Sequence, residues 1–203
     1  MQIKAASAPP YRFRLTLFAI GCLGLGVWFL HDGWVAYPKD REIHRAFQAL
    51  KKEGLEGDAL LDRWKQIAGP KGWPDGTFGE PGKDRSNFDI QFNLIAGAAL
   101  ELIGIWFGVG AWLHARRWIA LDGDNLTTSW GLTIPLEAIL TLDKSRWAEK
   151  GTALVIADAE RGGKCVVLDD WKYDRDATTK IVETIQRRLR PEQIVGDRPA
   201  AIG

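Results

Sequence analysis

The sequence predicts an α+β membrane protein that has two transmembrane helices, a helical hairpin in the loop between them, and a small antiparallel β module closed by a C-terminal helix. Three patterns support this prediction: two long apolar stretches, apolar residues at helical spacing between them, and short strands followed by one amphipathic helix. The average composition hides this organisation, because 46% hydrophobic residues, 26% charged residues and a net charge of +1 are also typical of a soluble domain.

Each apolar stretch is long enough, or nearly so, to cross a bilayer as a helix. The stretch at 15–30 has 16 residues and the stretch at 90–113 has 24, and a hydrocarbon core of about 30 Å needs roughly 17 to 25 apolar residues. We therefore predict transmembrane helices over residues 15–37 and 90–113, the first aided by slight thinning of the bilayer. Arg and Trp side chains near the helix ends are the expected membrane-interface anchors: Arg12, Arg14, Trp28, Trp34, Trp112, Arg116, Arg117 and Trp118.

The positions of the basic residues predict the orientation. Arg12 and Arg14 precede the first apolar stretch, and Arg116 and Arg117 directly follow the second. Basic residues beside transmembrane helices gather on the cytoplasmic side. We therefore expect a multi-pass integral membrane protein with both termini in the cytoplasm, including a short N-terminus of residues 1–14.

The loop of residues 38–89 is then expected outside the cytoplasm. Its first half has apolar residues at helical spacing, and the turn at 54–57 separates two helices of a hairpin at about residues 40–68. Residues 69–87 contain eight Gly or Pro and form a turn-rich segment that carries Trp73 and Phe78, able to cap the hairpin or grip a partner. Two interpretations of the hairpin stay open. Its apolar faces bury each other with Trp64 anchored at the membrane surface, which we favour, or they dock another chain.

An acidic residue, Glu101, lies at the midpoint of the second apolar stretch. An ionised carboxylate there costs at least a few kcal/mol, so Glu101 should face protein. The first stretch offers no basic partner, and Gly97, Gly104 and Gly108 provide small residues along the side of the helix that carries Glu101, where another helix can approach closely. We therefore expect helix association, in a homo-oligomer or with a partner membrane protein. The alternative is an ion or proton pathway lined by Gln91, Asn93 and Glu101.

The tail after the second apolar stretch has the pattern of a small β module. A hairpin is expected over 118–130 with its turn at 122–125, then a strand at 139–142 and a second hairpin with strands at 153–157 and 165–168. A helix capped by Asp174 or Asp176 follows and ends at Pro191. We expect residues 191–203 to be disordered.

Several turn and strand signals of this tail resemble the bacterial pleckstrin-homology-like (PH-like) domains that often follow paired transmembrane helices. The residues that carry the resemblance are 121–126, Gly131, 134–136, 150–152 and the closing helix at 176–189, within residues 117–190. The resemblance implies seven strands, of which we count five or six, and a closing helix. It also implies a binding or scaffolding module for lipid or protein contacts, without catalysis.

The sequence lacks the motifs of the common catalytic sites. Asp169–Asp170 and the cluster at 143–146 have no accompanying His or phosphate loop, and His31, Asp32 and His44 lack the spacing of metal ligands. Cys22 and Cys165 lie in different parts of the chain, so no disulfide is expected. We therefore predict no enzyme activity, no cofactor, no metal and no small-molecule substrate.

The charge balance bears on the possible partners. The loop at 31–89 has 10 Lys and Arg against 11 Asp and Glu, and the tail from His114 has 14 against 14, so nucleic acid binding is not expected. The tail also lacks the cluster of Lys and Arg typical of an anionic-lipid sensor. Besides the lipid bilayer, we expect protein partners. We expect the chain itself to be a non-catalytic scaffold, interaction module or subunit of a membrane complex. The alternative is a small membrane component of an ion or proton pathway that uses Glu101.

Overall fold

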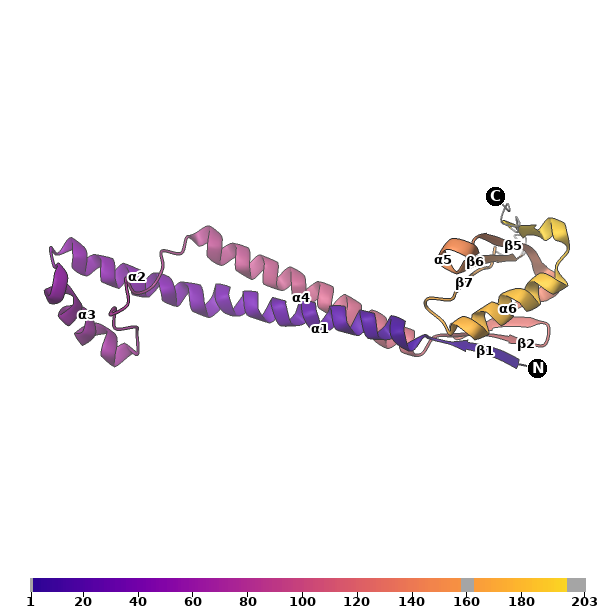
Figure 1. Ribbon diagram of the computed structural model, residues 1–203, viewed down its shortest axis with the longest axis horizontal. Helices are drawn as coiled ribbons and strands as arrows, with labels where there is room; N and C mark the ends of the chain where they lie inside the picture. Colours follow the sequence, from indigo (N-terminus) through magenta and orange to yellow (C-terminus); the bar gives the residue numbers. More distant parts are fainter. Residues whose placement is uncertain (1, 158–162, 197–203) are drawn as a thin grey trace, which may run out of the picture. The chain divides into compact units, whose positions relative to one another are not determined.

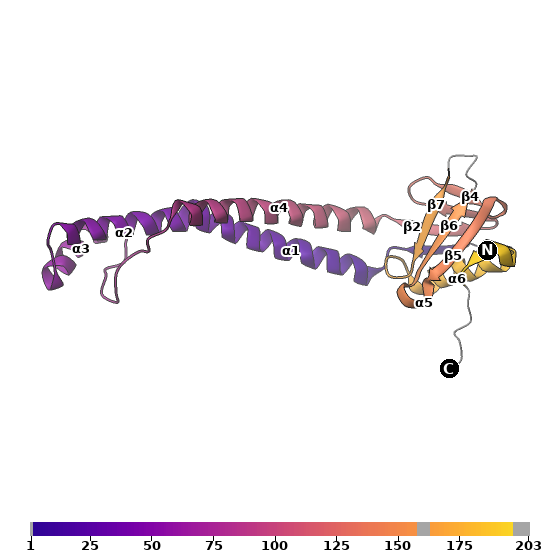
Figure 2. The ribbon, with the colours of Figure 1, turned by 90° about the horizontal axis from the view of Figure 1, so that it is seen from above.

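The computed structural model describes residues 2–157 and 163–196 of the 203-residue chain (Figures 1 and 2). The chain divides into two compact units, one made of Met1–Leu17 and Gly108–Gly203 and the other of Phe18–Phe107. The described residues form a mixed α+β structure with two long apolar helices and antiparallel sheets. This confirms the predicted class at that level.

The first apolar helix continues without a break into the following loop. α1 (Pro9–His31) leads into a π-helical segment, η1 (Asp32–Ala36), and then into α2 (Tyr37–Lys52). The expectation that the first helix ends at residue 37 and a new one starts near residue 40 is therefore wrong. Proline lacks an N–H group, and its ring clashes with the carbonyl four residues earlier in a regular helix. The wider π-helical turn directly before Pro38 contains that carbonyl and relieves the clash.

A helical hairpin follows, formed by α2 and α3 (Gly57–Lys71). Its two apolar faces bury each other around Trp64, which is fully buried. The indole Nε1 of Trp64 donates a hydrogen bond to the carbonyl oxygen of Pro74 at 2.8 Å, and the rings of Phe47 and Trp73 lie against it at centroid distances of 5.3 and 5.7 Å. The expectation that Trp64 anchors the hairpin at a membrane surface is therefore wrong.

The Gly/Pro-rich segment covers this hairpin and leads into the second apolar helix. Gly72, with a φ of 62°, ends α3 three residues after the predicted end at about residue 68. A Cβ at Gly82 would lie 2.6 Å from the backbone oxygen of Asp40, so only glycine permits this approach to α2. α4 (Asn87–Ala115) begins earlier than residue 90, because Ser86 and Asp89 exchange hydrogen bonds that satisfy backbone N–H groups of its first turn.

The β module contains two four-stranded sheets. The first has the order β1-β2-β3-β4 and is antiparallel, and the second has the order β7-β6-β5-β8, in which β8 runs parallel to β5. The strand bounds are β1 (Gln2–Ala6), β2 (Trp118–Asp122), β3 (Asn125–Thr128), β4 (Thr133–Pro135), β5 (Ile139–Arg146), β6 (Thr152–Ala157), β7 (Cys165–Asp169) and β8 (Ile194–Val195). Short helices η2 (Leu136–Ala138), α5 (Trp147–Lys150) and η4 (Pro191–Gln193) connect some of them.

The strand β1 comes from residues that precede the first apolar helix. It pairs with β2 in the antiparallel register Gln2↔Asp122 to Ala6↔Trp118. Ala5 is fully buried in the core of the module, and Ile3 packs against that core. The N-terminal segment of residues 1–14, for which the sequence predicted no strand, therefore supplies an edge strand and the first turns of α1.

The helix α6 (Arg175–Arg188) closes the module and contacts both β1 and β7 (Figure 1). Asp174 is its N-cap, with its Oδ1 atom accepting a hydrogen bond from the N–H group of Ala177 at 2.9 Å. Ile181 and Ile185 are fully buried on its inner face. Residues 191–196 are ordered, which corrects the expected start of disorder at Pro191. Residues 158–162, which fall between the two strands of the predicted second hairpin, and 197–203 lie outside the described residues.

Replacing Ala5 by aspartate should prevent β1 from completing the module. An uncompensated buried carboxylate costs about 3 kcal/mol or more, so we expect Ala5→Asp to lower the free energy of unfolding by that amount in thermal or denaturant unfolding in detergent. Ala6→Asp is the matched control, because Ala6 is the exposed neighbour on the same strand. Equal stability of the two variants would mean that β1 contributes nothing to the module.

Truncating Trp64 should unfold the hairpin. The buried indole fills the centre of the contact between α2 and α3, and replacing a buried Trp by Ala costs about 3 to 5 kcal/mol. We expect Trp64→Ala to speed proteolysis at residues 53–86 by about a hundredfold or more, the effect of that loss on the population of the locally open state. Phe78→Ala, at a fully exposed aromatic of the same unit, should leave the cleavage rate within about twofold of the unmodified chain.

Candidate functional site

The two long helices expose apolar surface along their length. Each contains an 18-residue window with a mean hydropathy of 1.8, of which only 11% is buried inside the protein. Phe18 and Trp28 on α1 and Leu102 and Trp106 on α4 are each more than 60% exposed. Both helices are therefore long and apolar enough to span a membrane, and their outer faces favour an apolar surrounding over water.

Glycines let these helices approach each other closely. A Cβ at Gly97 would lie 2.8 Å from the Cγ atom of Leu30 and 3.0 Å from the backbone oxygen of Gly26. A Cβ at Gly104 would lie 2.7 Å from the Cγ atom of Leu23. Real Cβ atoms do not approach other atoms so closely, so side chains at these glycines would push the helices apart. Close approach at small residues is how helices pack in an apolar solvent.

Glu101 lies in the middle of this contact, against Gly26 of α1. A Cβ at Gly26 would be 2.6 Å from the Oε1 atom of Glu101, so the carboxyl group occupies the space that a larger residue would fill. The Oε1 atom is buried and has no hydrogen-bond partner among the described residues. An unsatisfied carboxyl group of this kind in an apolar surrounding is costly, and it favours a partner from outside the chain.

The small-residue side of α4 therefore faces the chain's own first helix. Gly97, Glu101 and Gly104 were expected to receive another helix, and that helix is α1 of the same chain. Gly108 is half-buried on α4. The polar residues of the alternative pathway do not extend this site: Gln91 is exposed, and the Nδ2 atom of buried Asn93 donates to the backbone oxygen of Asp89 at 2.8 Å.

The expected interface anchors on the loop side of α1 are exposed. Trp28 is 67% exposed, and its Nε1 atom donates to the Oδ2 atom of Asp32 at 3.0 Å. Trp34 in η1 is 76% exposed. Indole rings with a polar end and an apolar body suit a bilayer interface.

Two of the expected anchors near the β module, Arg14 and Arg116, each lie over a Trp ring in a cation–π contact. The guanidinium of Arg14 lies 4.1 Å from the ring centroid of Trp171, and that of Arg116 lies 4.3 Å from the ring of Trp112. Arg12 is half-buried, with a buried Nε atom that has no hydrogen-bond partner among the described residues. Trp118 belongs to β2 of the module, where Lys4 of β1 lies 4.7 Å above its ring.

The acidic clusters that resembled catalytic pairs have structural roles. Asp169 accepts hydrogen bonds from the N–H groups of Trp171 and Lys172 at the end of β7, and Asp170 pairs with Arg175 at 2.9 Å. In the cluster at 143–146, hydrogen bonds from Ser145 hold the pKa of the Asp143 carboxyl below its usual value. These contacts shape turns and do not create a reactive group.

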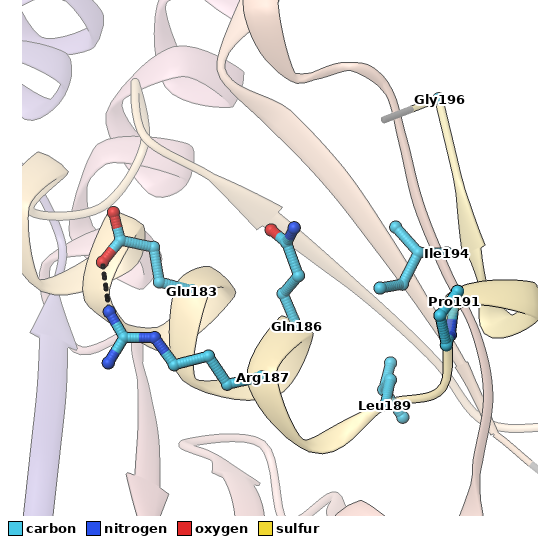
Figure 3. Close-up of a pocket in the computed structure, with 7 residues that line it drawn as sticks. All are labelled: Glu183, Gln186, Arg187, Leu189, Pro191, Ile194 and Gly196. Carbon is cyan, nitrogen blue, oxygen red and sulfur yellow. Dashed lines mark ion pairs between the residues drawn. The ribbon is translucent and has the colours of Figure 1, made fainter. Parts of the chain in front are cut away.

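A groove of about 770 Å³ lies between α6 and β8 (Figure 3). Its charged residues, Glu183 and Arg187, pair with each other on α6 at 3.9 Å. Its other lining residues are Gln186, Leu189, Pro191, Ile194 and Gly196. This groove brings together no nucleophile and general base, so it offers no constellation for catalysis.

Neither the search for a metal site nor the comparison with known proteins indicates a function. Within residues 2–157 and 163–196, no three His, Cys, Asp or Glu side chains lie close enough together to hold a metal ion, and His31 lies 3.7 Å from Asp32 as a simple pair. Comparisons of the chain with protein-family models, with curated proteins and with solved structures find no match. Function must therefore be argued from the geometry.

Sequence reasoning missed the group of residues that meets beside the ends of α1 and α4. His114, Trp171, Lys172 and Tyr173 come together there, with the ring of Tyr11 standing edge-on to His114 at 5.0 Å. The turn after β7 carried no signal except its alternating charges and aromatics, because its neighbours come from three distant parts of the sequence.

The glycine contact gives a prediction with a matched control. Alanine at Gly97 would meet Leu30 and Gly26, and overpacking of this kind costs about 1 to 3 kcal/mol. Alanine at Gly24 would meet nothing within 4 Å and would add helix propensity. We therefore expect Gly97→Ala to lower, and Gly24→Ala to maintain or raise, the SDS concentration at which the protein unfolds in mixed micelles. The reverse order would contradict the close packing of α1 on α4.

Proposed function

We propose that the protein crosses the bilayer twice and carries a non-catalytic module on the cytoplasmic side, where it acts as a scaffold or as a subunit of a membrane complex. The observation that carries the proposal is the pairing of β1 with β2. Residues before the first apolar helix and residues after the second belong to one sheet, so both lie on the same side of any membrane. Two crossings satisfy this condition, whereas one does not.

The surface of the helices supports insertion. Exposed Phe, Leu, Ile, Val and Trp side chains line α1 and α4, and glycines line the close contact between the two helices. A water-soluble helix of this composition would bury one face against a core. These helices leave most faces uncovered, as lipid contact requires.

Basic residues support the cytoplasmic side for the module. Arg12 and Arg14 lie in the first turns of α1, and Arg116 and Arg117 follow the end of α4, all in the unit that contains the module. By the rule that short flanking segments rich in Lys and Arg stay inside, the hairpin at α2 and α3 then lies outside.

The module supports the PH-like resemblance more fully than the tail sequence alone. The seven strands β1 to β7 form an antiparallel set of four and an antiparallel set of three, and α6 closes them. The strand that the tail sequence lacked is β1, contributed from before the first apolar helix. A module of this type implies protein or lipid contacts, which fits the lack of a catalytic constellation among the described residues.

Glu101 supports assembly through the helices, and it is also compatible with the alternative function, an ion or proton pathway. Its unpartnered Oε1 atom favours a donor from a second copy or from another membrane protein. The same carboxyl group would serve an ion or proton pathway if it exchanged a proton. The two functions predict different effects of Glu101→Gln, which retains a hydrogen-bonding group but cannot ionise.

Cysteine labelling tests the topology. Cys165 is exposed on the module, and Thr77→Cys would place a thiol on the loop between α3 and α4. In intact cells, a membrane-impermeant maleimide should label residue 77 and spare Cys165 until the membrane is permeabilised. The measurement uses single-cysteine variants that also carry Cys22→Ala. Labelling of Cys165 in intact cells would overturn the proposed orientation.

Complex mass tests the assembly. The full chain extracted from its native membrane in mild detergent should form a discrete assembly larger than one copy. We expect Glu101→Ala to release the monomer, while Glu101→Gln and the exposed control Gln91→Ala keep the assembly. A monomer in every case would contradict association. Loss of proton flux in proteoliposomes for Glu101→Gln, with assembly intact, would establish the pathway instead.

A further inference from the structure

A small basic cavity lies in the module where it meets the ends of the apolar helices. Its volume is about 260 Å³, and four segments meet at it: the end of α4, the residue directly before β2, the turn after β3, and β7 with the turn that follows it. Backbone hydrogen bonds fix these segments, from Ser7 to the oxygen of Arg117 at 3.1 Å and from Ala8 to the oxygen of Lys172 at 2.9 Å. The lining residues are His114, Arg117, Trp130, Cys165, Val167, Asp169, Lys172 and Tyr173.

The balance of charges in this cavity favours an anion. Arg117 and Lys172 are cations, and Asp169 is the single acidic residue of the lining. One oxygen of Asp169 already accepts two backbone N–H groups, and the other lies 3.4 Å from the Nζ atom of Lys172. With His114 neutral, the two cations and one carboxylate give the lining a net charge of +1.

Neutral donors add to the site. The Nδ1 atom of His114 is buried and has no hydrogen-bond partner among the described residues. Tyr173 is 5% exposed, and burial raises the pKa of its phenol, so the group keeps its proton and remains a donor. A cavity with a guanidinium, an ammonium, a phenol and an imidazole matches the acceptor oxygens of a phosphate.

The surroundings of the cavity match the interface of a bilayer. Arg117 comes four residues after Leu113, the last residue of the predicted second span. Trp130 forms one wall of the cavity. In the turn after β7, the ring of Trp171 is covered by Arg14. Cations that are far apart in the sequence thus lie together near the helix ends. The sequence did not reveal this cluster, because the tail has no run of Lys and Arg.

We propose that this cavity binds the phosphate group of an anionic membrane phospholipid, with Arg117 and Lys172 as the charged ligands. The inference rests on the proposed membrane insertion, which brings the cavity to headgroup depth. Basic pockets beside transmembrane helices on the cytoplasmic side recognise anionic headgroups in this way. The acyl chains extend from the cavity into the apolar part of the bilayer, and the headgroup lies against Trp130.

Native mass spectrometry of the full chain in detergent tests the proposal. The protein is titrated with phosphatidylglycerol and, separately, with phosphatidylcholine, and retained lipid is counted. We expect retention of one phosphatidylglycerol at concentrations where phosphatidylcholine is lost. In Arg117→Gln/Lys172→Gln the apparent affinity should fall by about tenfold or more, as the loss of two cations near an anionic headgroup predicts. The single variant Arg117→Lys, which keeps the charge, should retain most of the binding of the unmodified chain.

Controls separate the outcomes. Lys150→Gln/Lys180→Gln removes two exposed cations elsewhere on the module and should bind as the unmodified chain does, while circular dichroism verifies the fold of each variant. Equal binding by all variants, or no preference for phosphatidylglycerol, would overturn the site. Protection of the protein against heat by inorganic phosphate alone, lost in the double variant, would assign the cavity to a soluble phosphate and overturn the lipid. Release of the protein from membranes by alkaline carbonate would refute insertion itself, independently of these results.

Discussion

The backbone pairing between β1 and β2 is the constraint on which the rest of the structure depends. It joins five residues at the start of the chain to a strand that follows the second apolar helix. The pairing continues into the isolated bridge between Ser7 and Tyr173, and the hydrogen bond from Asp174 to the oxygen of Ala6 ties the start of α6 to the same segment. The chain therefore enters α1 and leaves α4 from one folded unit, and the basic cavity forms where these connections meet.

The contact between the apolar helices depends on a different kind of interaction. In an apolar surrounding there is no hydrophobic gain from bringing two helices together, so packing at small residues has to supply the attraction. Gly26, Gly97 and Gly104 provide that close approach, and Glu101 fills the space above Gly26. The carboxyl group is thus both a packing element and an unsatisfied polar group, and this combination explains why one residue supports two different functional interpretations.

Periodicity in the sequence was sufficient to predict the elements that are locally amphipathic or uniformly apolar. The second apolar helix, the hairpin of α2 and α3, the β2–β3 hairpin and the Asp174 cap all have local signals that the structure contains. β1 has none, because Gln2–Ala6 is rich in small and polar residues and becomes a strand only through its partner. The continuity of the helix through Pro38 was missed for a related reason, since it depends on the π-helical turn before it.

The candidate site could be predicted only in part. Glu101 and its glycines were identified from composition, but the sequence did not show that the approaching helix is α1 of the same chain. Trp64 illustrates the reverse error: an aromatic near a predicted membrane surface is buried among Phe47, Trp73 and Pro74. Such assignments depend on which distant segments meet, and a single sequence does not contain that information.

The origin of β1 before the first apolar helix also sets an order of events during synthesis. The first strand of the module leaves the ribosome early, but its partner appears only after both apolar helices have been made. Until then β1 has no sheet to join, and long-range pairing of this kind is slow compared with local folding. In a bilayer, a chain whose second helix failed to cross would leave β1 and β2 on opposite sides. The module could not close in such a chain, so its closure requires that the two helices cross together.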